Sequence, residues 1–459
     1  MEDILAIDVG TTLLKVGIFS PDLEEKLTTS RRYQVNLYDQ GKADVQPEEW
    51  WLALKSCCAE LREHLPGVGV ISLSVTTPGL VPMDEDGLAL GPAILFFDGR
   101  SRYQAKAIRE RVGEEFFLNH ACNLPVSGGS SLASILWIRE NQPEIWDKVA
   151  KFGHTNTYLV KRLTGHWAID PSTTSITGLY NSACNDLTWN EEVLFAAEIP
   201  ERFLPPLVHS HNAVGEILPS VAEELHLSPK AIVLCGGNDA VLGSLSGDIV
   251  ETGVISNING TCEITTVCVD HPVCSPNFNV RCHVIPGLWL TFFILNTGGS
   301  ALEWFHQTFC KDMTREQFFN EFAPSAIKNF INSPDIDALE QEIPVYIPFL
   351  QGSRYSLDLL TAGFQGLTLE TTREQLLLSV IKGNETYHAI HIKELSGMIK
   401  MGSRVLMTGG GAKIEGIVEV KKRWMGDFEY VFQNQSSLRG AAMLGQYYQR
   451  GYINLPPTT

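Results

Sequence analysis

Residues 4–19 read ILAIDVGTTLLKVGIF, and no other stretch limits the possible folds of this chain as strongly. Two apolar, β-branched runs flank a tight turn, which predicts strand, turn and strand. Gly10 lets the backbone come close to a ligand above the turn. Three side chains can meet phosphate oxygens, those of Thr11, Thr12 and Lys15. With the Asp8 carboxylate for hydrated Mg²⁺, the pattern indicates a metal–phosphate site, and an ordinary first hairpin is the alternative.

A second hairpin of the same kind occupies residues 255–269, ISNINGTCEITTVCV. Its Gly260-Thr261 pair stands where Gly-Thr stands in the first copy. Two such units about half a chain apart predict a duplicated fold that holds one nucleotide between two lobes. A third turn follows the apolar run at 405–407 and contains Gly409, Gly410 and Gly411. Its open backbone leaves room for a flat ligand or a phosphate.

In this order the three elements resemble the FGGY carbohydrate kinases of the actin/hexokinase/Hsp70-type ATPase superfamily. DVGTTLLK resembles the first phosphate loop, NGT the second and TGGGAK the adenosine loop. Four further segments agree with the family pattern, at residues 97–101, 129–141, 158–175 and 362–381. Two positions depart from it, since Ser134 replaces a usual Lys and Lys382 a usual acidic residue. The resemblance implies an α/β fold of two ribonuclease-H-like lobes with a nucleotide and sugar cleft between them, and ATP with Mg²⁺ as cofactors.

The length of 459 residues exceeds what one core supports, so two domains are expected. We assign residues 1–245 to an N-terminal lobe with the sugar site, the first phosphate loop and the catalytic aspartate. Residues 246–459 form a C-terminal lobe with the second phosphate loop and the adenosine loop. Helices are expected at 47–64, 101–119, 130–140, 155–163, 299–309, 371–399 and 436–449.

A formal net charge of −18 argues against nucleic acid as a partner, whereas ATP needs only local donors. No N-terminal signal is visible, and the longest apolar run, residues 288–295, is too short to span a bilayer. The ten cysteines form no CxxC pair with histidine partners, which favours reduced structural cysteines. A cytoplasmic protein without membrane partners is therefore expected, and a homodimer is compatible with the sequence.

Asp239 is the candidate general base. It lies in Gly236-Gly237-Asn238-Asp239, a glycine-rich passage from strand to helix where a side chain can face a cleft. It also matches the catalytic aspartate of the resembled family. The alternative is that Asp239 caps the helix that follows.

The acceptor side departs from the better-known members of the family. Thr77-Pro78 stands where xylulokinases carry Met-His and glycerol kinases carry Arg-Glu, Phe96 replaces a usual Trp, and Ala240 replaces a polar residue. Polyol contacts are therefore expected from the remaining polar groups near these positions, which are Thr76, Thr77, Asp98 and Arg100 together with Asp239. A surface ion pair is the alternative for Asp98 and Arg100.

The sequence thus predicts an ATP-dependent kinase for a small sugar, sugar acid or polyol. Two other functions stay open. One is a kinase for an atypical acceptor, such as a deoxysugar or a signalling metabolite. The other is an ATP-binding regulatory protein that has lost turnover, against which the presence of both Asp8 and Asp239 argues.

Overall fold

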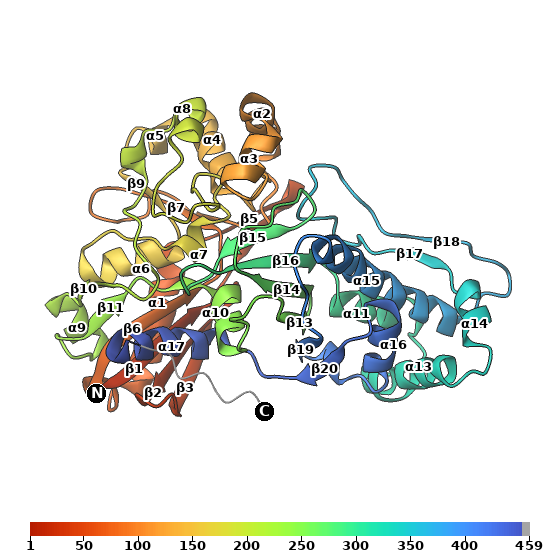
Figure 1. Ribbon diagram of the computed structural model, residues 1–459. Helices are drawn as coiled ribbons and strands as arrows, with labels where there is room; N and C mark the ends of the chain where they lie inside the picture. The colour runs from red at the N-terminus through yellow and green to blue at the C-terminus, as the bar shows by residue number, and fades with distance from the viewer. Residues whose placement is uncertain (452–459) are drawn as a thin grey trace. The chain divides into compact units, whose positions relative to one another are not determined.

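The computed structural model describes residues 1–451, which fold into two compact units (Figure 1). Unit 1 contains Met1–Val250, Asp270–Leu290 and the described part of the C-terminal segment from Gln435. Unit 2 contains Glu251–Val269 and Thr291–Asn434. No helix within residues 1–451 has the length and apolar character that crossing a bilayer requires.

The main sheet of unit 1 has the strand order β10-β11-β6-β1-β2-β3. Its strands are β1 (Asp3–Val9), β2 (Leu13–Phe19), β3 (Glu25–Arg32), β6 (Val68–Val75), β10 (Ala213–Glu216) and β11 (Ile232–Leu234), and β12 (Gly237–Asn238) also pairs with β6. Strand β1 runs antiparallel to β2 and parallel to β6, and β12 is also parallel to β6. The carboxyl ends of β1, β6 and β12 therefore meet at one edge, which carries Asp8, Thr76 and Asp239.

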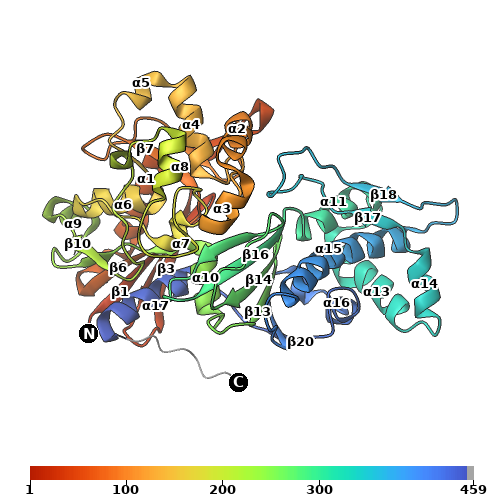
Figure 2. The same cartoon turned by 45° about the horizontal axis from the view of Figure 1, so that its top comes forward.

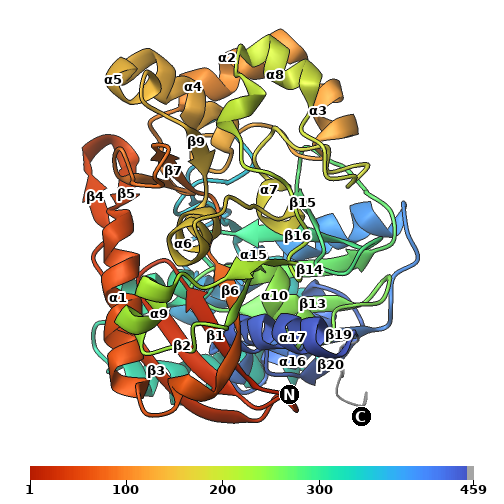
Figure 3. The same cartoon turned by 90° about the vertical axis from the view of Figure 1, so that its left-hand side faces the viewer.

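Helices cover both faces of this sheet (Figure 3). On one face α1 (Pro47–Leu61) and α6 (Thr155–Thr164) share a core with alternate residues of β1, among them Leu5 and Ile7. On the other face lie α10 (Asp239–Ser246) and α17 (Ser437–Arg450), which pack closely because a Cβ at Gly440 would stand 2.1 Å from the Leu242 carbonyl oxygen. Burial on both faces explains why the first strand reads as a nearly continuous apolar run.

Unit 2 repeats the hairpin and its parallel partners. Its strands follow the order β16-β14-β13-β19-β20, with β13 (Ile255–Asn259), β14 (Glu263–Val269), β16 (Trp289–Leu295), β19 (Arg404–Thr408) and β20 (Glu429–Phe432). Strand β13 is antiparallel to β14 and parallel to β19, as β1 is to β2 and β6. The predicted duplication of the glycine-threonine hairpin is therefore present.

Four helices of unit 2 pack around one apolar core, namely α11 (Gly299–Phe309), α13 (Ala323–Ile331), α15 (Arg373–Ser396) and α16 (Ile417–Trp424) (Figure 2). Helix α15 begins with a capping box, in which Thr372 and Gln375 satisfy each other's backbone N–H groups. This local signal fixes where the longest described helix starts.

The remaining elements extend the two units. Unit 1 adds a sheet with the order β4-β5-β8-β7-β9, formed by β4 (Asn36–Tyr38), β5 (Lys42–Val45), β8 (Ala93–Leu95), β7 (Gly79–Met83) and β9 (Lys151–Gly153). It also contains β15 (Asn279–Cys282), α2 (Arg102–Val112), α3 (Glu114–His120), α4 (Ser131–Asn141), α5 (Pro143–Trp146), α7 (Pro171–Thr174), α8 (Glu191–Ala197) and α9 (Pro219–Leu225). Unit 2 adds α12 (Arg315–Gln317), α14 (Ile336–Glu342), β17 (Val345–Ile347) and β18 (Gly363–Gln365).

Most of the expected helices are confirmed to within a few residues, and one of them is divided. The helical stretch expected at 101–119 is two helices, α2 and α3, which separate at Gly113. Gly113 has a φ of 96°, which ends the helix. Glycine adopts this positive φ readily, whereas residues with a Cβ atom rarely do.

Candidate active site

Asp239 is the first residue of α10, and it does not cap that helix. Asn238 is the N-cap, and its side-chain oxygen accepts a hydrogen bond from the Val241 N–H at 3.1 Å. The alternative that Asp239 serves as the cap is therefore wrong. Its carboxylate is available for other partners at a helix N-terminus, where negative charge is favoured.

Three groups donate hydrogen bonds to the Asp239 carboxylate. Oδ2 accepts a hydrogen bond from the Thr76 hydroxyl at 2.8 Å, and Oδ1 accepts from the Ala240 N–H at 2.7 Å and the Asn238 amide at 3.0 Å. Burial and the negative charge of Asp8 raise the pKa of Asp239 to about 6. A carboxyl group with this pKa is ionised near neutral pH yet more basic than an exposed aspartate.

Asp8 lies at the same edge of the sheet and is buried. Its Oδ1 accepts a hydrogen bond from the Ser74 hydroxyl at 2.8 Å, because the parallel register places Asp8 beside Ser74. Lys15 is the residue across from Asp8 in the hairpin, and it is exposed. Burial raises the pKa of Asp8, whereas the hydrogen bonds from Ser74 and Ser437 and the charge of Lys15 act in the opposite direction.

The turn after β1 is supported by Tyr33, a residue to which no sequence motif pointed. The Tyr33 hydroxyl donates a hydrogen bond to the Gly10 carbonyl oxygen, and the Gly10 N–H bonds to the Leu13 carbonyl at 3.0 Å. Thr12 is exposed and Thr11 is partly exposed beside them. The hairpin turn thus presents its hydroxyl groups to solvent on a fixed backbone.

Arg281 is a buried cation near the predicted base, and no motif pointed to it. Its Nη1 donates a hydrogen bond at 3.1 Å to the Thr77 hydroxyl oxygen, which also accepts from the Asn238 amide at 2.8 Å. The charge of Arg281 acts to lower the pKa of Asp239. Thr77, which the sequence analysis selected, therefore links this guanidinium to the N-cap of α10.

A second buried network holds the backbone before Asp239. The Asp170 carboxylate accepts hydrogen bonds from the hydroxyls of Ser172 at 2.5 Å and Ser210 at 2.7 Å. Because the Ser172 hydroxyl donates to Asp170, its oxygen accepts the Asn238 N–H at 2.9 Å. The glycine-rich passage is thus fixed from the 158–175 segment that the resemblance had included.

Asp98 and Arg100 form a closed ionic cluster rather than an exposed ion pair. Asp98 is 1 % exposed, and its oxygens accept from the Ala43 N–H at 2.6 Å and from the Arg100 N–H and Nε at 2.8 and 2.9 Å. Arg100 also bonds to Asp44 at 3.0 Å. The surface alternative is therefore wrong. Since both Asp98 oxygens already accept hydrogen bonds, this carboxylate is poorly suited to accept a proton. Phe96 lies just before the cluster in the sequence.

The other two predicted loops lie next to each other in unit 2. Parallel pairing of β13 with β19 places Ile258 beside Thr408, so the turn with Gly260 and Thr261 adjoins Gly409, Gly410 and Gly411. A Cβ at Gly409 would stand 2.4 Å from the Asn259 carbonyl oxygen, whereas a Cβ at Gly410 would meet nothing within 4 Å. The Gly260 and Thr261 carbonyls accept from the N–H groups of Gly299 and Ser300 at 2.9 and 3.2 Å, which ties the turn to the start of α11.

The comparisons with known proteins agree with one another. The N-terminal domain of the FGGY family of carbohydrate kinases matches residues 3–246. A xylulose kinase of Lactococcus lactis is 28% identical over 92% of this chain and 82% of its own length. A gluconokinase of Bacillus subtilis is 26% identical over 96% of this chain and 87% of its own length.

Solved structures match almost the whole chain. A ligand-bound xylulose kinase from Lactobacillus acidophilus has a TM-score of 0.89 at 19% identity, covering 99% of this chain and 91% of that one. A Plasmodium falciparum glycerol kinase with ADP has a TM-score of 0.84 at 19% identity, with 99% and 91% coverage. The expected α/β fold with two ribonuclease-H-like lobes is thereby confirmed.

Proposed function

We infer that Asp239 is the general base of the reaction that this chain catalyses. The chain belongs to the FGGY family of carbohydrate kinases, and it transfers a phosphoryl group from ATP to a hydroxyl of a sugar or polyol. The observation that carries this inference is the Asp239 carboxylate itself, held by Thr76 and Ala240 with a pKa of about 6. In the transfer step, the attacking hydroxyl gives its proton to Asp239 while its oxygen forms the new bond to phosphorus and ADP leaves.

The phosphates are assigned to the two glycine-threonine turns, and adenosine to the third glycine turn. The residues assigned to the phosphates are Gly10, Thr11, Thr12, Lys15, Gly260 and Thr261. The residues assigned to adenosine are Gly409, Gly410 and Gly411. Hydroxyl and backbone N–H donors with a cation suit the negative charge of the phosphates. The open space above Gly410 supports the placement of adenosine there.

Asp8 fits a role at Mg²⁺. Its carboxylate oxygens are hard ligands, and their burial, which raises the pKa of Asp8, would be offset by a nearby cation. When bound, through water or directly, the ion would neutralise charge that develops on the transferring phosphoryl group. Ser74 orients the carboxylate for that role by its 2.8 Å hydrogen bond.

The acceptor is a small sugar or sugar acid that contacts Thr76, Thr77 and Arg281. Xylulose kinases and a gluconokinase are both among the relatives, so a neutral ketose and a sugar acid are each represented. The permanent charge of Arg281 favours the acid, because a guanidinium pairs well with a carboxylate. Asp98 and Arg100, within the ionic cluster, and Phe96, just before it, are assigned to the shape of the acceptor site.

A substrate screen with purified protein tests these assignments. Pentuloses, hexuloses, sugar acids and polyols are compared by acceptor-dependent ADP release, with Asp239→Asn as the inactive control. We expect saturable turnover with a sugar or sugar acid, and an Arg281→Met variant that loses more kcat/KM with sugar acids than with neutral sugars. If the native protein binds ATP but none of the tested acceptors causes it to release ADP, the regulatory alternative is favoured instead.

Three further assignments are predictions of the same proposal. Apart from Arg281, the residues assigned to the acceptor precede residue 246, and the second phosphate loop and the adenosine loop follow it. The protein is expected in the cytoplasm, where ATP is abundant. A homodimer is expected to leave the kinase chemistry unchanged, since every group assigned to the reaction belongs to one chain.

A further inference from the structure

A small cavity in unit 2 lies among the glycine turns assigned above to the nucleotide. It has a volume of about 20 Å³ and is bounded by Asn259, by Gly298 and Gly299 at the start of α11, and by Gly411. A space of this size accommodates a group about as large as one water molecule. The cavity can therefore receive one substituent of a ligand rather than a whole ring.

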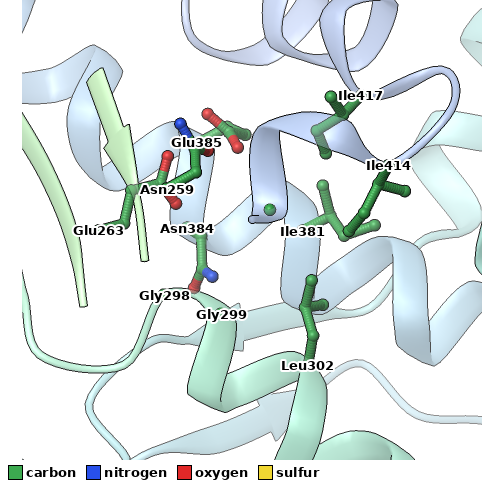
Figure 4. Close-up of a pocket in the computed structure, with 11 residues that line it drawn as sticks. Asn259, Glu263, Gly298, Gly299, Leu302, Ile381, Asn384, Glu385, Ile414 and Ile417 are labelled. Carbon is green, nitrogen blue, oxygen red and sulfur yellow. The ribbon is translucent and has the colours of Figure 1, made fainter. Parts of the chain in front are cut away.

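The wall of the cavity has an apolar side and a polar side (Figure 4). The apolar side chains are those of Leu302, Ile381, Ile414 and Ile417, and the polar ones are those of Asn259, Glu263, Asn384 and Glu385. Apolar walls with a few placed polar groups allow a small polar group that enters the cavity to bind in one orientation.

Two polar atoms of this wall are buried without a protein partner. Asn384 is 4 % exposed and Glu385 is 2 % exposed, and neither Asn384 Oδ1 nor Glu385 Oε2 has a hydrogen-bond partner among the described residues. Such groups are unfavourable when left unsatisfied, and they gain most from a ligand that supplies the missing partner. They mark the polar side as a place for a hydrogen-bonding group.

The polar side is held in place from behind by a fully buried lysine. Lys421 Nζ lies 2.7 Å from Glu263 Oε1 and 2.6 Å from Glu385 Oε1, so it engages one oxygen of each carboxyl group. Asn259 Nδ2 donates to Asn257 Oδ1 at 2.7 Å, which fixes the Asn259 amide as well. The wall is therefore preorganised before any ligand enters.

Among the described residues that line it, the wall offers no free cation to one part of a nucleotide, the phosphates. Its nearby ammonium, that of Lys421, is paired with the carboxyl groups of Glu263 and Glu385, so a phosphate would find no positive charge to pair with among these residues. Burial and the charge of Glu263 raise the pKa of Glu385 to about 8, so at neutral pH this group is mostly protonated and can also donate. A neutral group that carries N–H donors next to an acceptor fits these partners.

We propose that this cavity receives the exocyclic amino group of an adenine base and that Asn384 is the residue that selects adenine over bases with a carbonyl group there. The inference rests on the proposed function, because it requires the nucleotide to lie at these turns. Asn384 Oδ1 accepts from the amino group, and an asparagine amide is well matched to the amino and ring-nitrogen edge of adenine. The apolar side chains of the wall contact the amino group from the opposite side of the cavity.

Calorimetric titration of the full chain with ADP, IDP and 2′-deoxyADP tests the proposal without any acceptor sugar. IDP carries a carbonyl in place of the amino group, so we expect it to bind at least ~10-fold more weakly than ADP, whereas 2′-deoxyADP stays within about threefold. Asn384→Leu has a similar volume and should reduce the ADP preference to within about threefold. Asn320→Leu, at an exposed position of unit 2, should leave the preference unchanged.

The outcomes separate this inference from the assignment of the nucleotide site. Equal binding of ADP and IDP by the native chain overturns the role of Asn384 and leaves the nucleotide site standing. Weak binding of 2′-deoxyADP with normal binding of IDP also overturns it, because the cavity would then hold a ribose hydroxyl. If none of the three nucleotides binds, both the inference and the proposed nucleotide site are wrong. The comparison of ADP with IDP on the native chain remains decisive even if Asn384→Leu fails to fold.

Discussion

The hydrogen bond from Thr76 to Asp239 gives a quantitative prediction for the pH dependence of the reaction. Asp239 must be ionised to accept the proton, and its pKa is about 6. At saturating ATP, kcat/KM for the acceptor should therefore reach its plateau above that pH and fall about tenfold for each pH unit below it. At pH 5 about one tenth of the plateau should remain.

Removing the hydroxyl at position 76 should move the acid limb of the pH profile, where kcat/KM falls as Asp239 is protonated, to higher pH. The Thr76 hydroxyl donates to Asp239 Oδ2 at 2.8 Å and so favours the ionised carboxylate. A hydrogen bond to a charged group contributes about 1.5–3 kcal/mol, and one pKa unit corresponds to about 1.4 kcal/mol. Thr76→Val, which keeps the shape, should thus shift the limb to higher pH by roughly one to two units.

A matched control is available on the surface of the same unit. The Thr188 hydroxyl donates to Asp186 Oδ1 at 2.6 Å, and both residues are exposed. Thr188→Val removes the same type of bond away from Asp239 and should leave the pH profile unchanged. Titration of ATP itself affects both variants equally. If folded Thr76→Val shows the native acid limb, the assignment of that limb to Asp239 is refuted.

The remaining predictions test other parts of the site. Asp239→Asn should lower kcat by about 10²–10⁴ with little change in ATP affinity measured by calorimetry, and near-native turnover would contradict its role as base. Asp8→Asn should weaken productive Mg²⁺–ATP binding and recover part of its activity at high Mg²⁺, whereas a loss that is independent of Mg²⁺ would argue against a metal role. Gly410→Val should weaken ADP binding at least tenfold because the side chain would occupy space assigned to adenosine, and unchanged affinity would remove that assignment. Asp98→Asn should destabilise the protein by roughly 3–5 kcal/mol in urea unfolding, since it breaks a buried ionic cluster, and a loss of activity without a loss of stability would instead indicate direct contact with the acceptor.

The sequence by itself determined the repeated hairpins, the family and the positions of the glycine turns. These features are local, because alternating or continuous apolar runs, Gly-Thr turns and a capping box act over a few neighbouring residues. The expected helices followed for the same reason. The division at Gly113 was missed because an apolar pattern continues across a glycine whose backbone conformation the sequence does not state.

Tertiary structure decided which of these residues meet and what their neighbours do to them. Asn238, rather than Asp239, caps α10, since strand pairing with β6 presents the Asn238 amide to the helix end. Asp98 became part of a closed cluster through Asp44, 54 positions earlier in the chain, and Arg281 reached Thr77 from 204 positions away. Such contacts depend on the fold of the whole unit, and so do the burial and charge that raise the pKa of Asp239. Short-range sequence patterns do not specify which distant residues come together. The sequence therefore identified Asp239 as the candidate base, whereas the burial and the neighbouring charges that raise its pKa follow only from the fold.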